Sequence, residues 1–288
     1  MRTRLFLATV AAFAIVWLIF GGRSGDSTAR GQQRTTSAKT AGRQLVDALA
    51  EGRLIDLTHP FDEYTIYWPT EKGFVLEKGQ AGLTPKGYFY MANRFAAAEH
   101  GGTHLDAPIH FFEGRRTVEA IPLEQLVGEG AVVDVRQKCA DNPDYEIGIG
   151  DLRAWETSHR RQLVDMIVLL NTGYGRRWPD RKRYLGTDAR GPQAVAELHF
   201  PGLAPEAARW LSDERHIKAV GIDTASIDYG QSAHFQSHVR LFERNVPALE
   251  NLANLDLLPD GPFAVIALPM KIAGGSGAPL RIIAVTPK

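Results

Sequence analysis

The 288-residue sequence contains a single cysteine, Cys139, and no excess of charge of either sign. One thiol cannot form an internal disulfide, and it excludes a zinc site built from several cysteines. The 33 basic and 33 acidic side chains cancel. The sequence therefore lacks the positive footprint of a nucleic-acid-binding protein, and we expect no nucleic-acid partner. Cys139 follows the apolar run 131–135, which predicts that it lies at a strand end rather than acting as a nucleophile.

Long apolar stretches are scarce, and the most prominent one is at the amino terminus. Arg2 and Arg4 precede the 16-residue stretch 5–20, whose length lies between that of a signal-peptide core and that of a membrane span. We expect residues 1–20 to be a signal peptide or a membrane anchor. Either places the protein outside the cytoplasm, in the periplasm or extracellular space or anchored to the membrane through residues 5–20.

The remaining sequence divides into a linker and one large domain. Residues 21–42 are rich in Gly, Ser, Thr, Gln and Arg, a composition typical of a flexible linker. Residues 43–288 are enough for a single domain with a sizeable core. Short apolar runs predict strands at 54–57, 88–97, 131–135, 166–171, 219–223 and 263–268. Helices are predicted over 150–161 and 204–214, with a short turn at 122–126, and a leucine rhythm predicts another over 249–257. The pattern indicates a mixed α/β fold without internal repeats.

The segment from His100 to His110 concentrates metal-binding side chains. His104, Asp106 and His110 have the same parity, so an extended backbone would project them to one face. The glycines at 101 and 102 disfavour a helix, and we expect them to form a loop that folds His100 back. Imidazole nitrogens and a carboxylate suit Zn²⁺, Mn²⁺ and Fe²⁺. The alternative is a polar turn without a metal.

These residues resemble a known family signature. His100, Gly102, Thr103, His104, Asp106, Pro108 and His110 match the pattern His-x-Gly-Thr-His-x-Asp-x-Pro-x-His of the metal-dependent cyclase family, which includes bacterial kynurenine formamidases and isatin hydrolases. Segments 55–60, 67–69, 170–174, 221–228, 250–252 and 268–279 follow in family order. The resemblance covers about residues 53–286. It implies a swivelling β/β/α fold with a central barrel-like sheet, and a homo-oligomer.

The resemblance also implies roles for individual residues. His100, His104 and Asp106 would bind a first metal, with His110 beside it as general base. His238 and Glu250, twelve residues apart, would complete a two-metal site. His234 remains a competing candidate for the place of His238. The implied cofactor is one or two divalent ions per chain, Zn²⁺ or Mn²⁺. Three further residues are candidates for contacts with a small-molecule substrate: Tyr67, Trp68 and Gln231.

The function predicted on this basis is metal-dependent hydrolysis of a carbon–nitrogen amide bond, either arylformamidase-like or on a cyclic amide. A metal ion lowers the pKa of water, and His110 would take up its proton. Two alternatives stay open: a lyase, cyclase or lactone hydrolase, and an exported metal-binding protein without catalysis. The glycine-rich run 274–279 lacks the lysine of a phosphate-binding loop, and we expect a turn near the mouth of the site. Asp223 and Asp228 could orient metal-bound histidines or simply form turns.

Overall fold

The computed structural model describes residues 40, 42–44 and 46–288. The chain divides into two compact units, Met1–Ala48 and Leu49–Lys288. In the first unit, residues 40, 42–44 and 46–48 are helical. No helix among the described residues is long and apolar enough to cross a membrane. The predicted signal or anchor, residues 1–20, and linker residues 21–39 lie outside the described part of the chain.

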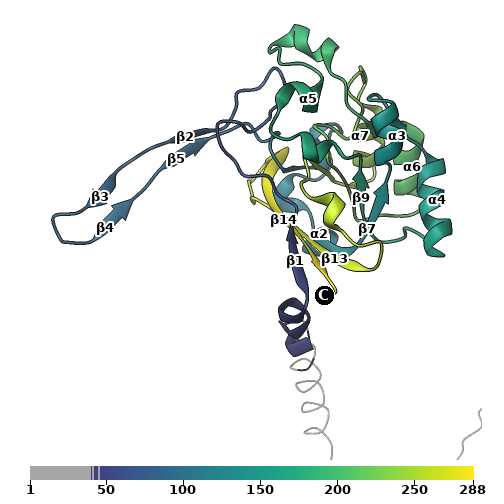
Figure 1. Ribbon diagram of the computed structural model, residues 1–288, viewed down its shortest axis with the longest axis horizontal. Helices are drawn as coiled ribbons and strands as arrows, with labels where there is room; N and C mark the ends of the chain where they lie inside the picture. Colours follow the sequence, from purple (N-terminus) through teal and green to yellow (C-terminus); the bar gives the residue numbers. More distant parts are fainter. Residues whose placement is uncertain (1–39, 41, 45) are drawn as a thin grey trace, which may run out of the picture. The chain divides into compact units, whose positions relative to one another are not determined.

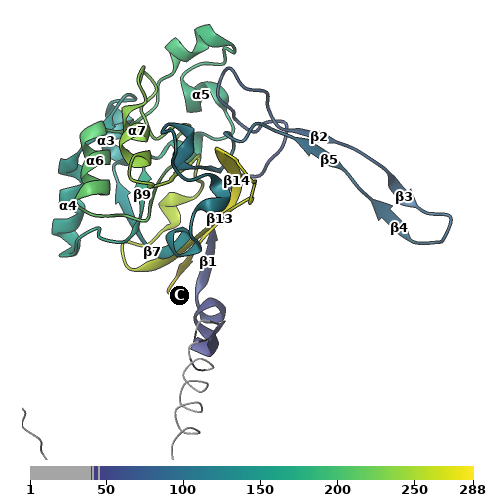
Figure 2. The same cartoon turned by 180° about the vertical axis from the view of Figure 1, so that it is seen from behind.

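An eight-stranded sheet lies at the centre of the second unit (Figures 1 and 2), and seven of its strands close into a barrel. The strand order is β1-β14-β13-β7-β9-β11-β12-β6, and β6 pairs again with β14 to close the ring. The bounds are β1 (Arg53–Asp56), β6 (His104–Asp106), β7 (Val127–Asp134), β9 (Ile167–Asn171), β11 (Ala219–Ile222), β12 (Ala248–Glu250), β13 (Phe263–Pro269) and β14 (Gly277–Thr286). The barrel-like sheet implied by the family resemblance is confirmed.

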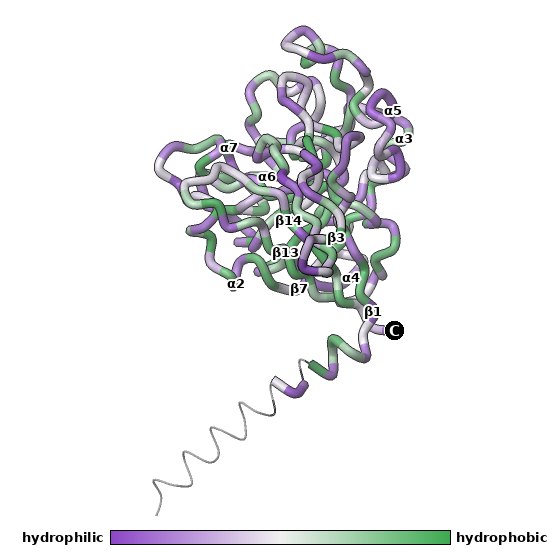
Figure 3. Tube along the Cα trace, turned by 90° about the vertical axis from the view of Figure 1, so that its left-hand side faces the viewer, coloured by the Kyte–Doolittle hydropathy of each residue, from purple (hydrophilic) through white to green (hydrophobic). Residues whose placement is uncertain are grey.

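Strand β9 shows why the central strands read as unbroken apolar runs. It pairs in parallel with β7 and β11 and is buried on both faces. Ile167 and Leu169 pack into the barrel interior, whereas Val168 and Leu170 pack into the core beneath the helices. A strand covered on both sides has no polar face, so its sequence does not alternate. In Figure 3 the hydrophobic stretches of the chain run through the body around β7 and β13, and hydrophilic stretches gather in outer loops.

Helices cover the outside of the parallel strands (Figure 1). The α-helices are α2 (Leu123–Leu126), α3 (Arg136–Asp141), α4 (Ile149–His159), α5 (Arg181–Leu185), α6 (Pro205–Asp213) and α7 (Gln236–Phe242). Short 3₁₀ helices are η1 (Pro108–His110), η2 (Val118–Ala120), η3 (Tyr174–Arg177), η4 (Pro192–Glu197) and η5 (Leu255–Leu257), and β8 (Glu146–Ile147) pairs with β10 (Gly202–Leu203). Helices α4 and α6 and the turn at α2 match the predicted ranges.

Cys139 lies in helix α3 and not at the strand end that the sequence predicts. The chain turns directly after β7, where Asp134 accepts a hydrogen bond from the backbone N–H of Arg136 at 3.1 Å. A carboxylate before a helix satisfies one of the free N–H groups of its first turn. Cys139 is buried, and burial raises its pKa to about 12. Since the thiolate is the nucleophile, burial and the raised pKa argue against a catalytic role, as the sequence predicts.

A long β-hairpin projects from the barrel (Figures 1 and 2). Its strands are β2 (Val75–Glu77) paired with β5 (Arg94–Ala96), and β3 (Ala81–Leu83) paired with β4 (Phe89–Met91). The predicted strand 88–97 therefore splits in two and lies in this arm rather than in the core. The break comes where Gly79 approaches the chain opposite, since a Cβ at Gly79 would lie 2.0 Å from the Ala92 carbonyl oxygen. We call residues 75–96 the arm.

Candidate metal centre

The strand that closes the barrel carries the centre of the predicted site. β6 pairs with β12 on one edge and with β14 on the other. In this register Glu250 lies opposite His104, a position in which cross-strand side chains interact. His104 and Asp106 are two residues apart on β6 and share one face, as their spacing predicts. The closure of the sheet thus joins chain segments about 150 residues apart.

Glu250 stands on a strand, so the helix predicted over 249–257 is wrong. The structure has β12 (Ala248–Glu250), a left-handed residue at Asn251 and only the short η5 afterwards. Leu249, Leu252 and Leu255 are all buried in the barrel interior. Their helix-like spacing reflects three separate approaches of the chain to that core, and pairing with β6 and β11 decides the local structure.

Two glycines fold His100 back toward β6, as the sequence predicts. Gly101 and Gly102 have φ of +155° and +57°. A Cβ at Gly101 would lie 2.1 Å from the Tyr67 ring, and one at Gly102 would lie 2.5 Å from the Phe61 ring. Only glycine combines this backbone with this clearance. The loop brings His100 Nδ1 to 2.6 Å from Asp106 Oδ1.

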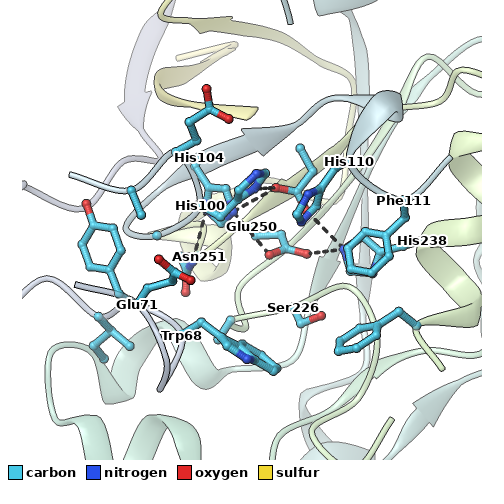
Figure 4. A pocket seen from close by; sticks show the side chains of 18 residues that line it. Trp68, Glu71, His100, His104, His110, Phe111, Ser226, His238, Glu250 and Asn251 are labelled. Atoms are coloured by element: carbon cyan, nitrogen blue, oxygen red, sulfur yellow. Dashed lines mark hydrogen bonds and ion pairs between the residues drawn. The ribbon is translucent and has the colours of Figure 1, made fainter. Parts of the chain in front are cut away.

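The imidazoles of three histidines converge on two carboxylates (Figure 4). On one side, His100 Nδ1 and His104 Nε2 lie 2.6 and 3.0 Å from Asp106 Oδ1. On the other side, His238 Nε2 lies 3.2 Å from Asp106 Oδ2 and 3.1 Å from Glu250 Oε1. Glu250 Oε2 is 3.5 Å from His104 Nε2. All of the predicted metal-binding side chains therefore meet in one place.

The structure brings His238, and not His234, to this cluster. His238 lies in the first turn of α7, whereas His234 precedes the helix and is exposed. Asp228 holds the start of α7, since its carboxylate accepts hydrogen bonds from the backbone N–H groups of Ser237 and His238 at 3.0 and 3.1 Å. The same carboxylate lies 2.6 Å from His238 Nδ1. Asp228 thereby points Nε2 of the ring at the two other carboxylates.

Of the two aspartates left open by the sequence, Asp228 contacts a histidine of the cluster and Asp223 does not. Asp223 instead organises the loop after β9. It accepts hydrogen bonds from the backbone N–H groups of Thr172, Gly173 and Gly175 at 2.8–3.1 Å. The glycine-rich run at 274–279 covers the end of the turn between β13 and β14 and the first residues of β14. Ser276 in this turn lies 2.9 Å from His100 Nε2.

His110 stacks on His100 at the edge of the cluster. Their ring centroids are 3.7 Å apart and the planes differ by 14°. The nitrogen and oxygen atoms of His100, Asp106 and His110 lie close enough together to hold a metal ion, as do those of His104, Asp106 and Glu250. Burial lowers the pKa of His110 to about 4. The imidazole is therefore neutral at pH 7 and has a lone pair that can accept a proton.

Burial and charge oppose each other throughout the cluster. Burial alone would lower the pKa of His104, but the Asp106 and Glu250 carboxylates outweigh it and raise the pKa to about 9. The pKa of His238 is raised well above its ordinary value against the same burial, chiefly by its hydrogen bonds to the surrounding carboxylates. Asp106 is also buried, yet its histidine neighbours hold its pKa well below the usual range. Burial and the charge of Asp106 raise the pKa of Glu250.

This arrangement fits a divalent cation. Two buried carboxylates within reach of each other need positive charge nearby, because isolated buried charge is costly. In the free protein, protons on His104 and His238 can supply it. A metal ion would supply it with the same atoms, because imidazole nitrogens and carboxylate oxygens are ligands of Zn²⁺ and Mn²⁺. Asp106 belongs to both groups of side chains that could hold a metal ion.

A cavity of about 380 Å³ opens over the cluster, a size that suits a small-molecule ligand. Tyr67 and Trp68 line it, as the sequence predicts. Tyr67 is buried, and its hydroxyl has no hydrogen-bond partner in the described structure. Gln231 lies elsewhere, because its side-chain amide donates hydrogen bonds to the backbone carbonyls of Ala196 and Leu198.

Several residues that line the cavity are not among those predicted from the sequence. Phe111 and Phe235 add aromatic walls, Ser226 and Glu71 add polar groups, and Asn251 lies at the base. Asn251 donates a hydrogen bond from Nδ2 to the Gly102 carbonyl at 2.8 Å. The run Glu250-Asn-Leu could have suggested it, since Asn251 directly follows a predicted ligand.

Comparisons with known proteins show which family the chain resembles. The model of a family described as "Putative cyclase" matches residues 55–229. An isatin hydrolase from Roseibium aggregatum is 30% identical over 210 residues, covering 70% of this chain and 77% of the relative. A kynurenine formamidase from Paracidovorax citrulli is 32% identical over 192 residues, covering 67% and 78%. The solved structure of isatin hydrolase A from Labrenzia aggregata, bound to benzyl benzoate, has a TM-score of 0.77 at 34% identity and covers 86% of this chain and 100% of that one.

Proposed function

Because the chain belongs to the putative cyclase family, we propose that it is a metal-dependent hydrolase that cleaves a carbon–nitrogen amide bond in a small aryl formamide or cyclic amide. The observation that carries the proposal is the convergence of three imidazoles and two carboxylates beneath a cavity with aromatic walls. Relatives named isatin hydrolase and kynurenine formamidase support this substrate class.

The cofactor proposed is one or two divalent ions, Zn²⁺ or Mn²⁺. Contacts on the Oδ1 side of Asp106 come from His100 and His104, and those on the Oδ2 side come from His238. Glu250 reaches both His104 and His238. This division supports a two-metal site in which Asp106 is shared. A metal bound there would lower the pKa of a water molecule from 15.7 to about 7 and polarise the substrate carbonyl.

The protein's own groups would then handle the proton and the substrate. The neutral imidazole of His110, at the edge of the cluster and lining the cavity, would take a proton from water and return it to the leaving nitrogen. Its stacking on His100 holds the ring over the cluster. Trp68 would contact a flat substrate along the opposite wall, since aromatic rings pack well against each other.

A product analysis in ¹⁸O-labelled water tests the reaction type. Hydrolysis of an N-formyl aniline or a cyclic amide must place one solvent oxygen in the product, whereas a lyase or cyclase reaction need not. The variant His110→Ala should keep its metal and lose turnover, and loss of the metal instead would reassign His110 as a ligand. The variant His234→Ala, at an exposed histidine outside the cluster, should keep both. Full turnover by protein stripped of metal would contradict the proposal.

We further propose that the protein is exported or anchored through residues 5–20, as the apolar stretch predicts. Sequencing the mature amino terminus after cell fractionation tests this proposal. A chain that begins after residue 20 would indicate cleavage, and an intact chain in the membrane fraction would indicate an anchor. An intact chain in the soluble cytoplasm would contradict both.

We propose as well that the protein is a homo-oligomer held by the arm. The arm carries eight large apolar side chains that are about half exposed or more: Val75, Leu76, Leu83, Tyr88, Phe89, Tyr90, Met91 and Phe95. A two-stranded ribbon alone is marginally stable in water. At roughly 100 Å² of exposed surface for a half-exposed aromatic, the four aromatic side chains alone present about 400 Å², about half of what one partner contributes to a standard interface.

The body carries exposed apolar residues that would receive such an arm. Leu123 on α2 and Leu268 and Met270 at the end of β13 are 65%, 46% and 45% exposed. A chain with both an apolar arm and an apolar surface suits a two-fold arrangement. Native mass spectrometry should find the wild-type chain and Val164→Ser, a change at an exposed site outside both surfaces, as oligomers. Leu83→Ser with Phe89→Ser, a cross-strand pair on the arm, should give monomers, and a monomeric wild type would contradict the proposal.

A further inference from the structure

His100 faces the cluster with a different nitrogen from its two neighbours. His104 donates from Nδ1 to the Gly102 carbonyl at 2.9 Å, and His238 has Nδ1 against Asp228 at 2.6 Å, so each presents Nε2 to the carboxylates. His100 presents Nδ1 to Asp106 and has Nε2 turned outward. The outward nitrogen of a metal-binding histidine needs a partner that fixes its proton.

That partner is a serine whose own proton is already committed. The Ser276 hydroxyl donates to Glu99 Oε2 at 2.6 Å, and the Ser276 backbone N–H donates to the same oxygen at 2.9 Å. Because a hydroxyl has only one proton, the oxygen can meet His100 Nε2 at 2.9 Å only as an acceptor. Nε2 must then carry a proton. In this structure Nδ1 also donates, to Asp106 Oδ1 at 2.6 Å, and loss of that proton would leave Nδ1 with the lone pair that a metal ion needs.

The glycine-rich turn between β13 and β14 is shaped to hold this serine. The Ser276 carbonyl accepts from the Ala107 N–H at 2.8 Å, next to Asp106 on the chain. A Cβ at Gly277 would lie 2.5 Å from His100 Cε1, so the absence of a side chain lets the imidazole lie flat against the turn. The sequence predicts only a turn for residues 274–279, and the contacts of Ser276 and Gly277 with His100 give this turn a role.

We propose that Glu99 and Ser276 are a positioning pair that fixes His100 as an Nδ1 donor to the metal. The pair acts through His100 and need not touch substrate. The Glu99 carboxylate acts on His100 through the Ser276 hydroxyl and makes Nδ1 a stronger electron-pair donor to a metal. Asp228 has the same effect on His238 by direct contact. Since His110 stacks on His100, the pair also holds the ring of the proposed base. The inference rests on the metal-dependent function proposed above.

Competition titrations of the full-length chain with Zn²⁺ and a chromophoric chelator test the pair without any substrate. Ser276→Ala and Glu99→Gln should each weaken Zn²⁺ binding by about 10- to 100-fold, and the double variant should be no weaker than the worse single one. Ser276→Thr keeps a hydroxyl and should restore most of the affinity. The matched control is Glu119→Gln, because Glu119 also accepts from this turn, at the Gly274 N–H, without reaching His100.

A second readout separates positioning from stability of the turn. In the zinc-bound protein, ¹H–¹⁵N correlation spectra of the imidazoles should show His100 protonated at Nε2, and Ser276→Ala should weaken or shift this signal. Unchanged zinc affinity in Ser276→Ala and Glu99→Gln would overturn the inference, whatever happens to turnover. Equal loss in Glu119→Gln would overturn it too, because general loosening of the turn would then explain the effect. Failure to find an amide substrate would weaken the proposed function and leave this result standing.

Discussion

His59 should make the fold sensitive to acid. Its ring stacks on Trp178 with centroids 4.3 Å apart, and Nε2 has no hydrogen-bond partner in the described structure. Burial lowers the pKa of His59 from 6.5 to about 4. At a pH between these two values, His59 binds a proton in the unfolded chain but not in the folded chain. The free energy of unfolding should therefore fall as the pH drops from 6.5 toward 4. Above pH 7 the His59 side chain should not lower this free energy.

The size of the effect follows from the two pKa values. A pKa difference of this kind corresponds to about 3 kcal/mol in full, at ~1.36 kcal/mol per pH unit. About 2 kcal/mol of this is lost between pH 7 and pH 5, because the unfolded chain is almost fully protonated at pH 5 while the folded chain is not. This loss is large against a typical stability of about 5–15 kcal/mol.

Urea unfolding of metal-free wild type and His59→Phe at pH 8, 7, 6 and 5 measures the loss. Phenylalanine keeps a ring against Trp178 and cannot titrate, so the variant should lose about 2 kcal/mol less between pH 7 and 5. Any difference at pH 8, where both proteins are neutral at this site, reports packing alone. His110 has a similarly lowered pKa and contributes equally to both proteins. Parallel pH profiles would refute the reasoning.

Three further predictions concern the cluster and the single thiol. Asp228→Asn should weaken metal binding about 10- to 100-fold by isothermal titration. The control Asp260→Asn alters a surface contact to a histidine outside the cluster and should leave metal binding unchanged. Equal effects of the two variants would argue against a specific role for Asp228. Glu250→Gln should reduce the metal content measured by mass spectrometry below that of wild type, and unchanged content would remove Glu250 from the ligand set. Cys139, buried and with a pKa raised to about 12, should react with a thiol reagent only after unfolding, and rapid labelling of the native protein would contradict its placement in the core.

The local sequence pattern was sufficient to predict the structure where one physical cause dominates. The apolar run ending at Asn171 predicts a strand because burial on both faces is the simplest reason for such a run. The parity of His104 and Asp106 predicts their common face, since strand geometry alone decides it. Pro205 and Glu206 at the start of α6 give the same kind of local signal, and the helix begins there.

Local pattern failed where distant pairing decides. Glu250 has the leucine spacing of a helix around it, yet β6 and β11 on its two sides hold it in a strand. Ser276 lies in a glycine-rich turn whose composition indicates only a turn, and its role comes from Glu99 and His100, about 175 residues earlier. The partners in these contacts lie too far apart in the sequence for any local pattern to include both.

Both failures have one source, the closure of the barrel by β6. This strand has only three residues, but it lies between β12 and β14, and these two strands bring Glu250 and the Ser276 turn to opposite edges of the same segment. Asp106 pairs with Ala248 on one edge and with Gly277 on the other. A shift of one residue in either pairing would turn the side chains of β6 to the other face and remove the metal donors from the cavity. The register of β6 is therefore the structural feature on which the whole candidate site depends.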